Sequence, residues 1–284
     1  MSDVRYSQYR DKRTTSGIRY SCSNINYMKA IIVNPNSSRA KGGATWMEIR
    51  EEVLRRLGGA QEFVTQKSGD ATRFAREIAL GAFEMVVVVG GDGTINEVVN
   101  GLYNEAGELL NPKIVMGLMS VGRGCDLRRS LGAPSNYRDA IGVLLNPKII
   151  KMDIGRAMYM DQFGRQKVSF FANSFSAGIS GDIIRNVNSA SGFLPPELTY
   201  FGFSALEFLS SRGHIMELTI DGKKVFDGRA LNIFVSNGRF CGAGMKWAPQ
   251  AELDDGLLNI IVLEPIPKYQ LLLSSHKLYK GTMN

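Results

Sequence analysis

Short apolar runs alternate with amphipathic segments along the first half of the chain. The runs are too short for helices and are rich in β-branched residues, so they predict buried strands; they lie at 29–34, 62–65, 85–89 and 113–119. Between them apolar residues recur at helical spacing, as at Trp46, Ile49, Val53 and Leu57. Strands alternating with helices predict a parallel sheet covered by helices on both faces.

The pattern changes near residue 147. Short strand-like runs follow one another at 149–160, 168–173, 215–220, 229–236 and 257–263, mostly separated by Gly, Asn and Asp. One helical pattern, at 196–211, interrupts them. We therefore expect a disordered polar leader at 1–28, an α/β domain at 29–146 and a mainly antiparallel β-sandwich domain at 147–284.

Composition excludes several functional classes. Apolar residues make up 44% of the 284 positions and charged residues 21%, which is typical of a soluble globular protein. No apolar run is long enough to span a bilayer, and no signal peptide is visible. Three separated cysteines suit a reducing cytoplasm, and two histidines are too few for a histidine-based metal site or triad. The net charge of +7 permits binding to anionic lipid, whereas the absence of dense basic blocks counts against nucleic acid.

A glycine-rich turn, Gly-Gly-Asp-Gly-Thr at 90–94, separates the strand at 85–89 from the following helix. Its three glycines allow positive φ and close approach of a ligand, and backbone N–H groups at a helix N-terminus bind phosphate. Asp92 would repel a bare phosphate, so it indicates a magnesium ion, a hydroxyl or a hydrogen-bond network. At a loop tip its carboxylate is expected to contribute little to the core. The alternative is an ordinary strand-to-helix turn.

The turn resembles the phosphate loop of diacylglycerol, sphingosine, ceramide and NAD kinases. Its extension Asn-Glu-Val-Val-Asn-Gly, at 96–101, is similar to the diacylglycerol kinase branch in particular. A second loop, at 120–134, also resembles that branch and keeps Asp126, but Arg123 stands where Thr is usual and Cys125 where Asn is usual. Arg123 either clasps a phosphate or obstructs the nucleotide pocket.

The resemblance spans residues 29–263 and implies an NAD kinase-like α/β domain followed by the β-sandwich. It implies Asp92 and Asp126 as catalytic residues. It implies an ATP site formed by Thr65, Gly91, Asp92, Gly93, Thr94, Ile95, Asn96, Glu97 and Arg123. It places Mg²⁺ at Glu252, Asp255 and the carbonyl of Leu257, where the alternative is a plain acidic hairpin turn.

The implied activity is ATP-dependent phosphorylation of a lipid hydroxyl, that of diacylglycerol or a related lipid. Such a protein is expected in the cytoplasm, peripherally bound to the membrane that holds its substrate. The sequence does not decide whether it forms a homodimer. The family's later Asp-Gly-Glu segment, with its proposed general base, has no match after Asp255. The sequence is therefore either truncated or catalytically incomplete. The alternatives are a non-catalytic nucleotide- or lipid-binding relative and an NAD kinase.

Overall fold

The chain was analysed as a computed structural model, which describes residues 6–10, 28–38, 45–119, 125–183, 211–242, 244–265 and 277–282, the first of these ranges as backbone only. Its N-terminal half contains a parallel sheet in the order β3-β2-β4-β5. These strands are β2 (Lys29–Val33), β3 (Gln61–Val64), β4 (Met85–Val89) and β5 (Val115–Met119). All four strands predicted for this half are confirmed, with ends shifted by no more than two residues.

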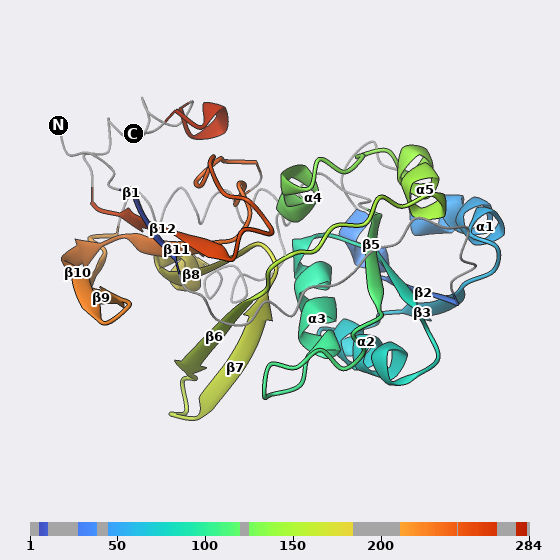
Figure 1. Cartoon of the computed structure of the whole chain (residues 1–284), viewed down its shortest axis with the longest axis horizontal. Coiled ribbons are helices and arrows are strands. Elements are labelled where there is room, and N and C mark those ends of the chain that lie inside the picture. Colours follow the sequence, from blue (N-terminus) through green and yellow to red (C-terminus); the bar gives the residue numbers. More distant parts are fainter. Residues whose placement is uncertain are drawn as a thin grey trace, which may run out of the picture.

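Helices cover both faces of this sheet, as predicted (Figure 1). The helices are α1 (Trp46–Arg56), α2 (Asp70–Leu80), α3 (Asp92–Leu102), α4 (Asp126–Ser130) and α5 (Tyr137–Leu145), and a 3-10 turn, η1 (Pro35–Ser38), follows β2. Successive residues of a strand point to opposite faces, so Val86 and Val88 pack with α2 and α3 while Val87 and Val89 pack with α1 and α5. This two-sided burial explains the unbroken valine run of β4.

The second half is antiparallel. Its main sheet has the order β1-β12-β11-β8, and two hairpins, β6-β7 and β9-β10, accompany it. The strands are β6 (Gly155–Met160), β7 (Gln166–Phe171), β8 (Ser174–Gly178), β9 (His214–Ile220), β10 (Lys223–Ala230), β11 (Asn232–Ser236) and β12 (Leu257–Leu263). The run predicted as one strand at 229–236 is divided at Leu231 between β10 and β11, which belong to different sheets.

The expected leader contains a strand. β1 (Tyr6–Arg10) pairs antiparallel with the edge of β12, from Tyr6 opposite Ile261 to Arg10 opposite Leu257. The structure therefore differs from the expectation of disorder at these five residues. The rest of the leader and the predicted helix at 196–211 lie outside the described residues. Among those described, no helix has the length and apolar character needed to cross a membrane.

Asn100 on α3 joins the two halves. Its side-chain Nδ2 donates to the carbonyl of Phe170 (2.8 Å), and its Oδ1 accepts from the N–H of Phe170 (2.8 Å), so the amide pairs with β7 as a neighbouring strand would. The Tyr103 ring stacks on the Phe170 ring at 4.9 Å. Gly101 allows α3 to lie against α2, since a Cβ there would stand 2.3 Å from the Thr72 carbonyl oxygen. These contacts hold β7 beside α3.

Candidate active site

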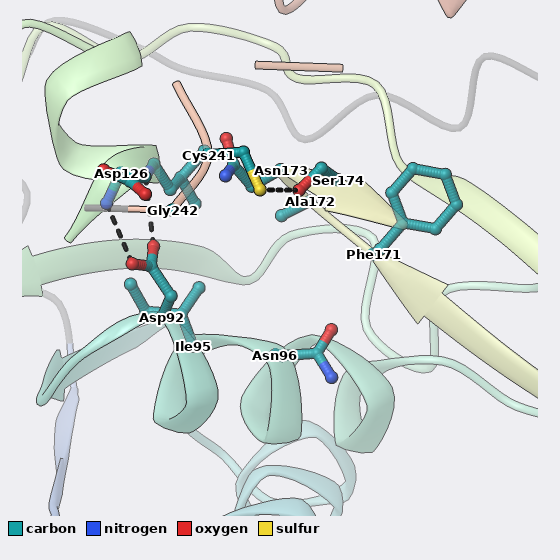
Figure 2. Close-up of a pocket in the computed structure, with 11 residues that line it drawn as sticks. Asp92, Ile95, Asn96, Asp126, Phe171, Ala172, Asn173, Ser174, Cys241 and Gly242 are labelled. Atoms are coloured by element: carbon teal, nitrogen blue, oxygen red, sulfur yellow. Dashed lines mark hydrogen bonds between the residues drawn. The ribbon is translucent and has the colours of Figure 1, made fainter. Parts of the chain in front are cut away.

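Asp92, the first residue of α3, supports the loop that leads into α4. Its carboxylate accepts hydrogen bonds from the backbone N–H groups of Asp126 (2.9 Å) and Leu127 (3.1 Å), as Figure 2 shows. These N–H groups begin a helix and have no partner within it, so the carboxylate caps α4. Asp92 therefore contributes to the fold, which differs from the expectation for a loop-tip carboxylate. A carboxylate has about four acceptor positions, so a further donor can still bind.

Asp126 is brought to Asp92 by this cap. Its side chain is almost fully buried, with 4% of the residue exposed, and its Oδ1 lies 3.6 Å from Nε of Arg129 one helical turn later. The two predicted catalytic carboxylates come from separate motifs, and the structure places both of them on the wall of one pocket.

That pocket has a volume of about 390 Å³ and lies between the two halves of the chain. Figure 2 shows the carboxylates at one end and the Phe171 ring at the other, with α3 along one side. Its walls combine acidic, polar and apolar groups: Asp92, Ile95, Asn96, Asp126, Leu127, Phe171, Ala172, Asn173, Ser174, Cys241 and Gly242. The site thus fits a ligand with one polar end and one apolar part.

The wall formed by residues 171–174 was not predicted as part of the site. Asn173 and Ser174 follow β7, and the Ser174 hydroxyl lies 3.3 Å from the Cys241 sulfur. The available signal was the change from Phe170-Phe171 to Asn173-Ser174 at the end of a predicted strand. Sequence alone did not show that this strand end meets α3, because the contact depends on Asn100.

The carboxyl ends of β2, β3 and β4 meet at one edge, as expected for parallel strands. Val33 pairs with both Val64 and Val89, so Asn34, Thr65 and the glycine turn lie next to one another. Asn34 Nδ2 donates to Thr94 Oγ1 (3.1 Å), and Thr65 and Thr94 are both buried. The structure therefore brings Thr65, Thr94 and the glycine turn, all predicted for the ATP site, to the same edge of the sheet.

The glycines of the turn do not adopt positive φ, contrary to the reason given from the sequence. Gly90 is needed because a Cβ would stand 2.7 Å from the Thr94 side chain. A Cβ on Gly91 or Gly93 would meet no atom within 4 Å, so these two residues leave open space beside the N-terminus of α3. Exposed N–H groups at a helix N-terminus favour an anion.

Glu97 was predicted for the ATP site, and in the structure it also holds the start of α2. Its carboxylate accepts from the Ser68 hydroxyl (3.2 Å) and from the N–H groups of Gly69 (3.0 Å) and Ala71 (3.2 Å). It therefore caps α2 from the neighbouring helix. Ile95 and Asn96, also predicted for the ATP site, line the pocket. Arg123 lies outside the described residues.

Two thiols lie near the carboxylates, and burial suppresses the ionisation of both. Burial, reinforced by the negative charge of Asp92, raises the pKa of Cys125 to about 12. Burial also raises the pKa of Cys241. At neutral pH both side chains are therefore uncharged, and neither is a thiolate nucleophile.

The predicted magnesium residues lie in the turn before β12. Asp255 Oδ1 accepts from the Leu257 N–H (2.9 Å), and the Gly256 N–H donates to Asp153 Oδ2 (2.6 Å). Glu252 is exposed to solvent. No group of three or more His, Cys, Asp or Glu side chains arranged to hold a metal occurs in the part of the chain that the structure describes. The turn as it stands does not fit a preformed metal cage, and magnesium at Glu252, Asp255 and Leu257 stays a prediction.

Comparison with known proteins agrees with this two-part arrangement. Residues 29–157 match the family model of the diacylglycerol kinase catalytic domain, and residues 173–283 match that of the YegS C-terminal NAD kinase beta sandwich-like domain. Residues 29–157 are therefore similar to a diacylglycerol kinase catalytic domain, and the domain matched after them is similar to a sandwich of the NAD kinase type.

Its relatives include two bacterial diacylglycerol kinases. That of Bacillus subtilis (strain 168) is 29% identical over 236 residues, covering 82% of this chain and 73% of the relative. That of Staphylococcus carnosus (strain TM300) is 28% identical over 239 residues, covering 82% and 72%. A solved diacylglycerol kinase structure from Bacillus anthracis str. Sterne has a TM-score of 0.60 at 21% identity, covering 90% of this chain and 78% of that one. The structural likeness shows a shared fold.

Proposed function

We propose that the chain is an ATP-dependent lipid kinase whose acceptor is diacylglycerol or a related lipid with a free hydroxyl. The observation that carries this proposal is the pocket, in which Asp92 and Asp126 lie at one end and the Phe171 ring at the other. A glyceride with a free hydroxyl has the same division, since its hydroxyl is polar and its acyl chains are apolar. The match of residues 29–157 to the diacylglycerol kinase catalytic domain supports the same reaction class.

ATP fits the edge of the parallel sheet next to this pocket. Gly91 and Gly93 leave room at the N-terminus of α3, where backbone N–H groups would face the phosphates. Thr65, Thr94 and Arg123 are the remaining side chains proposed for the nucleotide. Phosphoryl transfer depends mainly on positioning and charge neutralisation, and Mg²⁺ bound with ATP would supply part of that neutralisation.

The reaction joins the acceptor oxygen to the γ-phosphorus and breaks the bond from that phosphorus to the β–γ bridging oxygen, which leaves on ADP. Asp126 is the carboxylate proposed to accept the hydrogen bond of the acceptor hydroxyl and then its proton. Asp92 holds the Asp126 backbone in place through the α4 cap and remains able to accept one more hydrogen bond. The lipid lies in a bilayer, so the protein would act at the membrane surface from the cytoplasm.

The test is to incubate the purified protein with ATP and Mg²⁺ and, separately, a diacylglycerol, sphingosine and NAD, and to identify products by mass spectrometry. We expect phosphatidic acid and an equal amount of ADP from the diacylglycerol. Phosphorylation of NAD alone would contradict the proposal. ATP binding without any phosphorylated product would instead support a non-catalytic relative.

A further inference from the structure

The β6–β7 hairpin exposes apolar side chains at its free end. Figure 1 shows the hairpin projecting away from both sheets, with its turn at the tip. Phe163 in the turn is 70% exposed, and Met160 and Met158 on β6 are 64% and 62% exposed. Tyr159 points to the other face of the strand and is also exposed. Four large apolar groups therefore surround one small projection, which is costly in water unless they meet an apolar partner.

The turn is built to hold its phenyl ring in place. The Asp161 carboxylate accepts from the N–H groups of Phe163 (2.9 Å) and Arg165 (2.9 Å), and from Nε of Arg165 (2.9 Å). The Arg165 guanidinium lies over the Phe163 ring, 5.0 Å from its centroid. The hairpin's acidic group is thus paired with a cation, and the ring is presented by an ordered turn.

The charges around this apolar tip favour a negatively charged partner. Arg156, Arg165 and Lys167 lie on the two strands and their turn, against the single acid Asp161. Basic residues near an anionic leaflet strengthen binding, and apolar side chains insert at the boundary between headgroups and acyl chains. Apolar side chains at the tip, with Arg165 beside them and Arg156 and Lys167 along the strands, suit such a leaflet.

The hairpin also leads to the pocket. The Phe175 ring lies 6.3 Å from Tyr159 on the hairpin and 6.0 Å from Phe171, which lines the pocket. The paired strands extend from Phe171 to Gln166, and five steps of about 3.4 Å make roughly 17 Å. The rings of Tyr159, Phe175 and Phe171 thus connect the hairpin to the apolar end of the pocket.

We propose that the β6–β7 hairpin is the membrane-docking element of this protein, inserting Met158, Met160 and Phe163 into an anionic lipid surface beside the pocket. This rests on the proposed lipid-kinase function, since a membrane surface is where its acceptor would be found. The hairpin then serves both to anchor the protein and to guide the acceptor.

The test is co-sedimentation of the full chain with vesicles of phosphatidylcholine containing phosphatidylglycerol, at low salt. The double variant Met160→Ala/Phe163→Ala should bind at least tenfold more weakly than wild type. The matched control, Met47→Ala/Leu80→Ala, removes side chains that are 79% and 70% exposed on the α/β domain and should bind as wild type does. Unchanged binding of the hairpin variant, or an equal loss in the control, would overturn the proposal.

A fluorescence measurement distinguishes docking from unfolding. Trp46 and Trp247 are buried, so a tryptophan introduced by Phe163→Trp reports mainly on the tip. Its emission should shift to the blue with anionic vesicles, whereas Leu80→Trp should not shift; no shift at position 163 would contradict insertion. Phosphorylation of a short-chain diacylglycerol below its micellar concentration tests the kinase separately. Failure there removes the proposed function, while the vesicle result still decides the docking surface.

Discussion

The side chain of Asn100 and the backbone of Phe170 form a pair of hydrogen bonds that joins the α/β domain to the β domain. Both distances are 2.8 Å, and Asn100 Oδ1 also accepts from the Ser169 hydroxyl at 3.2 Å. Phe170 precedes Phe171, the residue at the apolar end of the pocket. One amide on α3 therefore fixes the wall against which the acceptor would lie.

Asn100→Ala should lower the free energy of unfolding by about 1–3 kcal/mol, because it leaves the backbone N–H and C=O of Phe170 without these partners. Urea denaturation measures this change. Asn104→Ala, which removes an amide from the nearby loop, is the control and should cost less. If the two variants unfold alike, Asn100 does not hold the domains together as described.

Asp92→Ala should both destabilise the protein and abolish phosphoryl transfer. The lost cap of α4 should cost about 0.5–2 kcal/mol, the range for removal of a helix cap. Chemical denaturation together with a lipid-kinase assay separates the two effects. An unchanged free energy of unfolding would show that the hydrogen bonds to Asp126 and Leu127 contribute nothing, and retained activity would remove Asp92 from the site.

Cys125 should make stability fall at alkaline pH. Its pKa is raised to about 12 in the folded protein from a usual value near 9.0, so the unfolded chain loses this proton first. The contribution of Cys125 to the free energy of unfolding is thus complete below about pH 9 and disappears as the pH rises toward 12. Urea denaturation at pH 8 and at pH 10.5 measures the loss of stability between them, which should be smaller in Cys125→Ala than in wild type. An equal loss in wild type and variant would mean that this thiol titrates normally.

Magnesium should raise the melting temperature if the turn before β12 rearranges to bind it, because a ligand that binds only the folded state stabilises it. Thermal melting with and without Mg²⁺ measures this increment, which Asp255→Asn should lose. Asp221→Asn, in the β9–β10 turn, should keep it. An increment of the same size in all three proteins would place the ion elsewhere.

The parts of the fold that could be predicted from the sequence are those determined by local pattern. The run Val86–Val89 is apolar at every position because both faces of β4 are covered. Periodicity predicted α1, α2 and α3 because each of these helices buries one face against the sheet. The division of 229–236 at Leu231 was missed because both halves are equally strand-like. Which sheet each half joins depends on β12, which pairs with β11.

The site was predictable where a motif carries the residues and not where distant segments meet. The resemblance implied Asp92 and Asp126 together as catalytic residues, and both line one pocket because each follows a strand of the parallel sheet. The Glu97 cap on α2 depends on the close approach of α2 and α3. Gly101 permits this approach, but a glycine within a helical pattern does not by itself predict it. Residues 171–174 line the pocket partly because Asn100 pairs with β7, a contact between segments 70 residues apart.

The most direct test of the proposed activity is the initial rate of phosphate transfer from radiolabelled ATP to a short-chain diacylglycerol by wild type and Asp126→Asn. Asp139→Asn, an exposed substitution on α5, is the control. We predict labelled phosphatidic acid from wild type and from the control, and a rate at least 100-fold lower from Asp126→Asn, within the range for loss of a general base. No labelled product from wild type, or an unchanged rate in Asp126→Asn, would contradict the assignment of this pocket as the site of phosphoryl transfer.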